Sequence, residues 1–132
     1  MLSDMDLKAL RLRPDDDLRA SLLAYCTEQN VEAAFVLTCT GSLKQAVIRF
    51  ADAPGGTVLE QPLEILTLSG TLSRHGAHLH ITVADAHGHV LGGHLLEGSM
   101  IYTTAELVLG FVPDTEFRRK HDPATGYTEL EL

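Results

Sequence analysis

The sequence is poor in positive charge. Its 132 residues contain 10 lysines and arginines against 18 aspartates and glutamates, so the formal net charge at pH 7 is −8. Nucleic-acid binding draws on a cationic footprint, and the sequence as a whole provides none. The one basic cluster is Arg118-Arg119-Lys120, which we interpret as a solvated strand edge or loop. Net charge therefore disfavours DNA as a partner.

Cysteines and long apolar runs are also scarce. The two cysteines, Cys26 and Cys39, fall in an expected helix and an expected strand, and we interpret them as buried small apolar residues rather than a disulfide. No apolar run approaches the ~20 residues of a membrane span, and the N-terminus MLSDMDLKAL is not a signal peptide. We expect a cytoplasmic protein with no membrane partner. There is no phosphate loop, CxxC pair or Ser-His-Asp order, so catalytic residues stay unknown.

The remaining pattern predicts one α+β domain over residues 1–132. Hydrophobic residues make up 45% and charged residues 21%, as in soluble globular proteins. Helical spacing of apolar residues predicts one main helix near the N-terminus, from Leu18 to about Gln29. Gly41-Ser42 is expected to separate two strands that form a hairpin, at 31–40 and 43–50. In total we expect a mainly antiparallel sheet of about seven or eight strands.

Six of the seven histidines lie between residues 75 and 98. Successive side chains of a strand alternate between its faces. The strand expected at 78–84 therefore has an aliphatic core face made of Leu79, Ile81 and Val83. His78 and His80 point the opposite way, roughly 6 to 7 Å apart along the strand. That spacing lets two imidazoles tilt towards one ion, with metal–nitrogen bonds of about 2.0–2.1 Å.

The turn after this strand decides where His94 lies. A three-residue loop at 86–88 sets His80 directly opposite His94, and directly opposite residues share a face. A five-residue loop keeps that pairing, whereas a two-residue turn would set His94 opposite Ile81 on the core face. Gly88 supplies the left-handed residue that three-residue loops need. We therefore predict that His78, His80 and His94 converge.

Three imidazoles leave an open coordination position, as in catalytic zinc sites and in ligand-binding sites. Imidazole suits zinc, copper, iron or nickel, and we expect zinc first. The alternative is that the histidines are ordinary residues on a half-exposed face. A bulge at Gly92-Gly93, where glycine is costly in a strand interior, would also move His94 off the shared face.

Two acids are weighed as further members of the site. Glu97 follows His94 by three residues and would point to the other face unless a bulge intervenes. Glu106 lies on the next long strand, where it would be an acid behind the metal ligands or a general base. Neither is assigned as a ligand on this pattern.

Several short runs together resemble the plant-and-prokaryote-conserved (PPC) domain. They are Thr40-Gly41-Ser42-Leu43, LEILTLSG at 63–70, His78-Leu79-His80, Gly92-Gly93-His94-Leu95 and the ending from Phe117 to Tyr127. The resemblance implies a compact α+β domain that assembles into homotrimers, with the family's histidine positions falling on His78, His80 and His94. Plant members carry an AT-hook before the domain and build DNA-binding proteins, and stand-alone bacterial and archaeal members are often labelled by that association. This sequence lacks the Arg-Gly-Arg-Pro hook, so the mechanism of DNA binding does not carry over.

Three functions are compatible with these features. The first is a stand-alone homotrimer of this family that binds a divalent metal, zinc first, for a small-molecule ligand or for regulation. The second is a DNA-associated regulator that uses a basic patch formed only in the trimer. The third is a metal-dependent hydrolase with Glu106 or another acid as base. The sequence favours the first, and with it a role other than catalysis.

Overall fold

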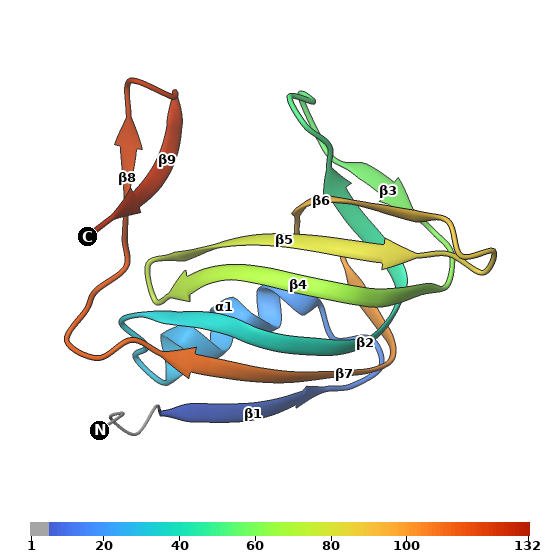
Figure 1. Ribbon diagram of the computed structural model, residues 1–132, viewed down its shortest axis with the longest axis horizontal. Coiled ribbons are helices and arrows are strands. Elements are labelled where there is room, and N and C mark those ends of the chain that lie inside the picture. Colours follow the sequence, from blue (N-terminus) through green and yellow to red (C-terminus); the bar gives the residue numbers. More distant parts are fainter. Residues whose placement is uncertain (1–5) are drawn as a thin grey trace.

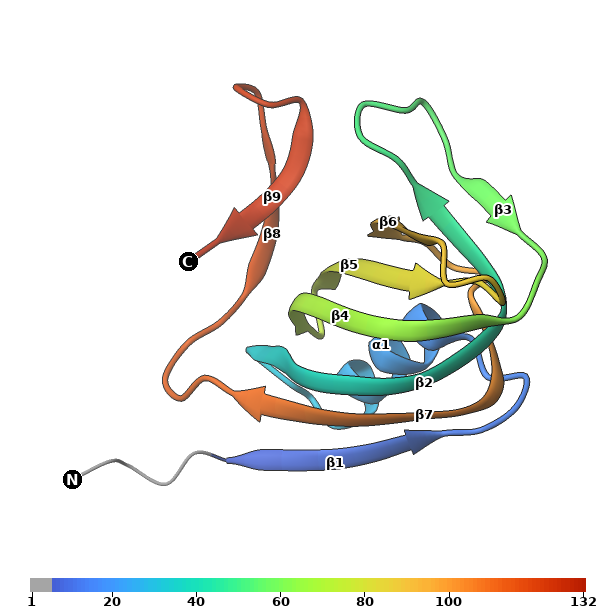
Figure 2. The ribbon, with the colours of Figure 1, turned by 45° about the vertical axis from the view of Figure 1, so that its right-hand side comes forward.

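The computed structural model describes residues 6–132, and it confirms the α+β class (Figure 1). The elements in chain order are β1 (Leu7–Leu12), α1 (Leu18–Glu28), β2 (Ala34–Arg49), β3 (Thr57–Leu59), β4 (Leu63–Ser73), β5 (Gly76–Ala84), β6 (Val90–Leu95), β7 (Met100–Phe111), β8 (Arg118–Asp122) and β9 (Tyr127–Glu131). Seven strands form one antiparallel sheet in the order β1-β7-β2-β4-β5-β6, with β3 added to β2. The strands β8 and β9 form a separate hairpin that stands beside this sheet (Figure 2).

The large sheet curls until it closes on itself. β5 lies between β4 and β6, and the end of β6 returns to the end of β2 through the pairs Ile48 with Leu95 and Arg49 with His94. The strands β2, β4, β5 and β6 therefore form a closed ring. Closure pairs strand edges that would otherwise be left open. It also brings the last residues of β2 beside the histidines of β5 and β6.

The expected hairpin at Gly41-Ser42 is wrong. β2 is one strand of 16 residues that runs through this point, with β4 on one side and β7 on the other. A Cβ at Gly41 would lie 2.1 Å from the carbonyl oxygen of Thr104, so glycine serves a close approach of β7 and not a turn. The register of β2 with β7 shifts on either side of Leu43, and such shifts bend a strand. The bent strand pairs with β4 and β7 along its length and still reaches β6 at its end.

The helix α1 covers the inner side of the curved sheet, as Figure 2 shows. Asp17 caps its N-terminus, because its carboxylate accepts a hydrogen bond of 3.0 Å from the backbone nitrogen of Ala20. The predicted apolar stripe is confirmed in that Leu18, Leu22 and Cys26 are fully buried. On the sheet, the aliphatic residues alternate inwards as expected, with Leu79, Ile81 and Val83 at most 1% exposed. The histidines between them therefore face away from the core.

Two other expectations concern cysteine and the membrane. Cys26 and Cys39 are both buried and free, so the absence of a disulfide is confirmed. Burial raises the pKa of the Cys26 thiol to about 11 and that of Cys39 to about 12. The one helix found among residues 6–132 has 11 residues and is neither long nor apolar enough to cross a bilayer.

Candidate metal centre

The hairpin β5–β6 has the register that the sequence predicts. Its loop spans Ala86 to Gly88, the backbone nitrogen of Asp85 donates to the carbonyl of His89 at 3.0 Å, and Gly88 has φ +79°. His80 consequently lies directly opposite His94. No bulge interrupts the ladder from His80 to Ala84, although Gly92 and Gly93 lie within it.

Close packing of β6 against its neighbours explains why glycine occupies the two positions before His94. A Cβ at Gly92 would lie 2.3 Å from the carbonyl oxygen of Ile81 on β5. A Cβ at Gly93 would lie 2.6 Å from the carbonyl oxygen of Arg49 on β2. Both distances are too short for any side chain, so glycine here lets β6 fit closely between its two neighbours and keeps His94 in register.

The three histidine rings come together in space. The ring centroids of His78 and His80 are 4.9 Å apart, those of His78 and His94 5.3 Å, and those of His80 and His94 5.9 Å. One ring nitrogen from each residue lies within 4.8 Å of the other two. The Nε2 atoms of His78 and His80 are 3.2 Å apart. Two nitrogens bound tetrahedrally to one zinc ion are separated by about 3.3 Å, given bonds of about 2.0–2.1 Å. The donor set therefore fits a metal ion.

The surroundings keep two of these imidazoles neutral. Burial, followed by the neighbouring charge of His78 and then Arg49, lowers the pKa of His94 to about 4. Burial also lowers the pKa of His78, with smaller contributions from His80 and Arg119. A neutral imidazole is the form that binds a metal, so protons compete weakly for these two nitrogens near neutral pH.

Three arginines that the sequence did not connect with the histidines lie next to them. Arg49 ends β2 and is paired across the ladder with His94. Arg119 of β8 donates a 2.9 Å hydrogen bond to the hydroxyl of Thr71, which lies directly opposite His78. Arg19 of α1 reaches the carbonyl of Ala77 at 3.4 Å. The expectation of a solvated basic cluster is therefore wrong for Arg119, which is half-buried.

These residues line a hollow of about 490 Å³ between the sheet and the C-terminal hairpin. His78 and His94 face it from β5 and β6, Arg19, Arg49 and Arg119 surround it, and Tyr127 and Glu129 come from β9. We call it the histidine hollow. The guanidinium carbon of Arg49 lies 5.8 Å from the centre of the Tyr127 ring, so the two side chains face each other across its edge. The sequence did not reveal that Arg49 lies beside His94, because it did not predict the pairing of β2 with β6.

Neither weighed acid joins the histidines. Glu97 follows the end of β6 and forms an exposed ion pair with Arg19 at 3.4 Å. Glu106 lies on β7 opposite Arg11 of β1 and Thr40 of β2, and it does not line the histidine hollow. The acid that does line the hollow is Glu129, which the sequence pattern did not single out.

A second group of possible metal ligands consists of Glu32, His75 and Glu116. Its carboxylates are already paired, because Arg74 contacts Glu32 at 2.8 Å and Glu116 at 3.3 Å. Arg118 contacts Glu116 at 2.8 Å as well. We interpret this group as an ion-pair network that holds the segment before the C-terminal hairpin, with His75 as a member and not as an isolated surface residue.

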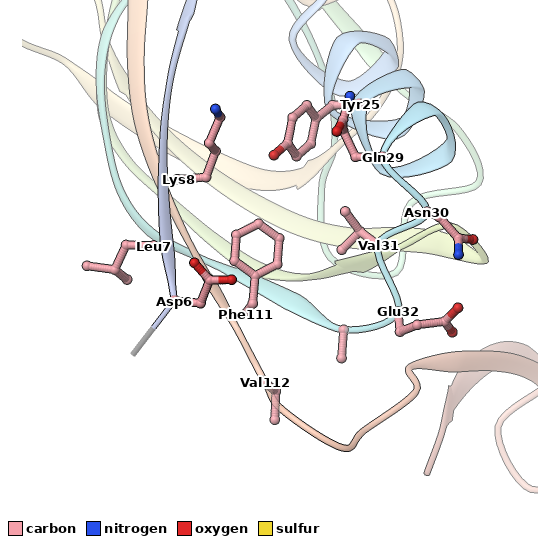
Figure 3. Close-up of a pocket in the computed structure, with 11 residues that line it drawn as sticks. Asp6, Leu7, Lys8, Tyr25, Gln29, Asn30, Val31, Glu32, Phe111 and Val112 are labelled. Carbon is pink, nitrogen blue, oxygen red and sulfur yellow. The ribbon is translucent and has the colours of Figure 1, made fainter. Parts of the chain in front are cut away.

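Another hollow, of about 510 Å³, lies on a different part of the surface (Figure 3). It opens between the end of α1, the start of β1 and the end of β7, and the phenol of Tyr25 points from the helix towards β1. Its described lining is a mixture of apolar and polar side chains without histidine or cysteine. We therefore place the candidate metal centre at the histidine hollow and not at this one.

The family assignment rests on a sequence match. Residues 2–113 match the model of the Plants and Prokaryotes Conserved (PCC) domain, the family abbreviated PPC above. The chain belongs to this family. The match includes His78, His80 and His94 and ends before β8, so the C-terminal hairpin lies outside it.

Relatives and solved structures agree with this assignment. A Synechococcus protein named bifunctional protein GlmU is 52% identical over 93% of this chain, which spans about a fifth (20%) of that relative's length. A structure described as a hypothetical protein from Salmonella enterica is 37% identical, covers 99% of this chain and 95% of its own, and has a TM-score of 0.93. A metal-containing protein from Archaeoglobus fulgidus is 27% identical, with 96% and 94% coverage and a TM-score of 0.84.

Two further structures, from Bacteroides thetaiotaomicron and Ralstonia eutropha, are described as candidate DNA-binding proteins. They are 20% and 21% identical, both with a TM-score of 0.81. The first covers 96% of each chain, and the second covers 94% of this chain and 90% of its own. At this identity the likeness shows the shared fold alone.

Proposed function

We propose that this protein binds one divalent transition metal per chain through His78, His80 and His94. The observation that carries the proposal is the convergence of three ring nitrogens, from two paired strands, within 4.8 Å of one another. Zinc is the first expectation, because it accepts imidazole ligands in tetrahedral sites. The metal-containing relative from Archaeoglobus fulgidus supports the proposal from outside this chain.

The metal would serve a bound ligand rather than the fold. Three protein ligands leave a position open, and this pattern separates working zinc sites from structural ones, which are closed by four. The rings lie on the outer face of the sheet beside a hollow, while the core on the other face is complete without them. We therefore propose a metal-dependent ligand-binding or regulatory protein of this family.

Elemental analysis tests the metal. The protein is purified without an affinity tag, beside the double variant His78→Ala/His80→Ala, and transition metals are counted per chain. About one metal per wild-type chain and none in the variant is the expected result. His121→Ala is the matched control, because His121 lies on β8 outside the three-histidine group and its loss should leave the metal content unchanged. A wild type that is free of metal and takes up no zinc contradicts the proposal.

We also propose that the chain assembles as a homotrimer, as the family resemblance implies. We propose that a partner chain covers some of the exposed apolar side chains of the sheet, such as Leu37, Leu66 and Tyr102, which are 53%, 47% and 51% exposed. Sedimentation velocity at two protein concentrations checks the assembly. A particle of one chain's mass at both concentrations argues against it.

DNA binding is the second candidate, and the descriptions of the Bacteroides and Ralstonia proteins favour it. The net charge of −8 opposes it, since phosphate contacts require a cationic surface. A salt-sensitive shift of duplex DNA at about 0.15 M salt would support this candidate. A metal-dependent hydrolase is the third candidate. Hydrolytic turnover by the wild type that is lost in the variant His94→Ala would support it.

A further inference from the structure

We propose that the histidine hollow takes a small oxyanion, whose carboxylate or phosphate group is held by Arg49 and Arg119 as the molecule fills the open position of the metal. This inference rests on the proposed metal site and extends it, because it names the charge of the ligand and the residues that select it. It follows from where the two arginines lie, what they contact and what charge surrounds them.

Each arginine is fixed beside a different histidine. Arg49 is the ladder partner of His94, and directly opposite residues of antiparallel strands have Cβ atoms about 4.5–5.5 Å apart. Arg119 is bonded to Thr71, the ladder partner of His78. Neither position depends on a flexible loop, since Arg49 ends β2 and Arg119 lies within β8. The two cations therefore stand on separate strands at the edge of the three-ring group.

Neither arginine has an acidic partner within bonding distance among the described residues. The side chain of Arg49 forms no hydrogen bond or ion pair with any described residue, and it faces the ring of Tyr127. Arg119 bonds the neutral hydroxyl of Thr71, and its buried Nε has no partner. The contrast is Arg118, the next residue in the chain, which is paired with Glu116 at 2.8 Å. Glu129 lines the same hollow but is not hydrogen-bonded to either arginine. A half-buried guanidinium that bonds no carboxylate is a binding group for an oxyanion.

The charge around the hollow is opposite to that of the protein. The chain has a formal net charge of −8, but among residues 6–132 three arginines and one carboxylate, that of Glu129, line this hollow. A divalent ion on the histidines would add to the positive charge. A concave surface of one sign concentrates ions of the other sign. The hollow therefore attracts anions although the protein as a whole is acidic.

The same arginines work against the metal when no anion is present. Like charges repel, and Arg49 lies opposite His94 in the ladder while Arg119 is bonded to Thr71, the ladder partner of His78. An oxyanion between the metal and the guanidinium groups removes that repulsion. Metal and anion should therefore each raise the affinity of the other by the same factor, because coupling between two binding sites is reciprocal.

The size of the hollow limits the ligand. Its volume of about 490 Å³ lies within the roughly 300–1,000 Å³ of sites for small molecules. A planar carboxylate or a phosphate matches the fork of a guanidinium. The competing explanation is structural, because Arg119 also ties the C-terminal hairpin to β4 through Thr71. A purely structural arginine would not make the response depend on the kind of anion.

The test uses full-length protein loaded with Co²⁺, whose visible spectrum reports what fills the open position, after unbound metal has been removed. Malonate, methyl phosphate and chloride are titrated at equal ionic strength, so that carboxylate and phosphate are compared with a simple anion. We expect saturable spectral changes with malonate, methyl phosphate or both, and none with chloride in the same range. Calorimetric titration of the metal-free protein should give at least tenfold weaker anion binding.

The variants Arg49→Gln and Arg119→Gln should each weaken oxyanion binding by roughly 10- to 150-fold, the range expected for a lost hydrogen bond to a charged group. In chloride both should bind Co²⁺ as tightly as the wild type or more tightly, because a repelling charge is gone. Lys120→Gln removes a positive charge from the same strand, at an exposed side chain outside the described ion pairs, and should bind oxyanion like the wild type. A structural role predicts the reverse, with weaker metal binding and no preference among anions.

The outcomes separate the two levels of the argument. A wild type that takes up no Co²⁺ overturns the proposed metal site and this inference with it. A wild type that binds Co²⁺ but responds equally to all three anions overturns this inference alone, and so does oxyanion binding that both arginine variants retain. Selective binding of malonate or of methyl phosphate would identify which oxyanion group the hollow recognises.

Discussion

His80 and His94 lie directly opposite each other in the β5–β6 ladder, with ring centroids 5.9 Å apart. Their pairing is set by the three-residue loop that joins the two strands. Adding or removing one residue in the loop would shift the register by one and move the side chains of β6 to the opposite face of the sheet. In this loop the backbone nitrogen of Gly88 donates to the carbonyl of Asp85 at 3.0 Å. The convergence of the histidines therefore depends on a turn at the exposed end of the hairpin.

The first prediction concerns Gly88. Its φ of +79° is left-handed, and no atom lies within 4 Å of the position that a Cβ would occupy. Gly88→Ala should lower the free energy of unfolding by about 1–2 kcal/mol through the backbone alone. Urea denaturation measures it, with Gly55→Ala as the control, since that glycine is equally open and is not left-handed. Equal stability of the two variants would contradict the assigned loop.

The second prediction concerns the fit of β6 against β2. Gly93→Ala would place a methyl group 2.6 Å from the carbonyl oxygen of Arg49, so the two strands must separate. We expect a loss of about 1–3 kcal/mol in stability from this overpacking. Because the strands carry His94 and Arg49, zinc uptake should weaken at the same time. Calorimetric zinc titration beside thermal denaturation checks both, and an unchanged zinc affinity in a destabilised variant would separate the site from the closure of the sheet.

The third prediction concerns the two thiols. Burial raises the pKa of Cys26 to about 11 and that of Cys39 to about 12, and the thiolate is the reactive form. Native protein at pH 8 should therefore react very slowly with a thiol reagent, and both thiols should become available in denaturant. The variants Cys26→Ala and Cys39→Ala assign the two reactions. Rapid labelling of either thiol in folded protein would show that its strand or helix opens locally.

The fourth prediction is a pH dependence of stability. Hydrogen bonds from Arg118 and then His75 lower the pKa of Glu116 to about 2, compared with an ordinary value of 4.5. A depressed folded-state pKa means that the carboxylate stabilises the fold above about pH 4.5 and loses this effect as the pH falls towards 2. Glu116→Gln should thus be less stable than the wild type at pH 6, with the difference closing in acid. Urea denaturation across this range measures it, and Glu60→Gln, at an exposed acid outside the described ion pairs, should show no such trend.

The histidine hairpin was predictable because its determinants are local. Alternation of side chains assigns Leu79 and Ile81 to the core and leaves His78 and His80 on the other face. The position of Gly88 selects the loop, and the loop sets the register of His94. The helix was predictable for the same reason, since its cap and apolar stripe lie within one short segment.

The rest depends on contacts that are distant in the sequence. Gly41 suggests a turn when read beside Ser42, and only the approach of Thr104 on β7 shows why a long strand needs a glycine there. Arg49 and His94 are 45 positions apart in numbering and become neighbours through the closure of β2 on β6. Arg119 reaches the site through a hairpin that pairs with no strand of the large sheet. Composition shows that acidic residues outnumber basic ones, but it does not show that three of the arginines line one hollow.

The C-terminal hairpin has a consequence for how ligand preference could change. It follows the family match and meets the sheet through a few side chains, including Arg119 on Thr71 and Tyr127 against Arg49. The histidines, in contrast, belong to the closed ring of strands. In the proposed site, the histidines and Arg49 thus belong to the closed ring, whereas Arg119 and Tyr127 come from a separate piece of chain. Under the proposed function, substitutions within β8 and β9 should alter the anion preference while the three histidines stay in place, which makes this hairpin the natural place to redesign the specificity of the proposed site.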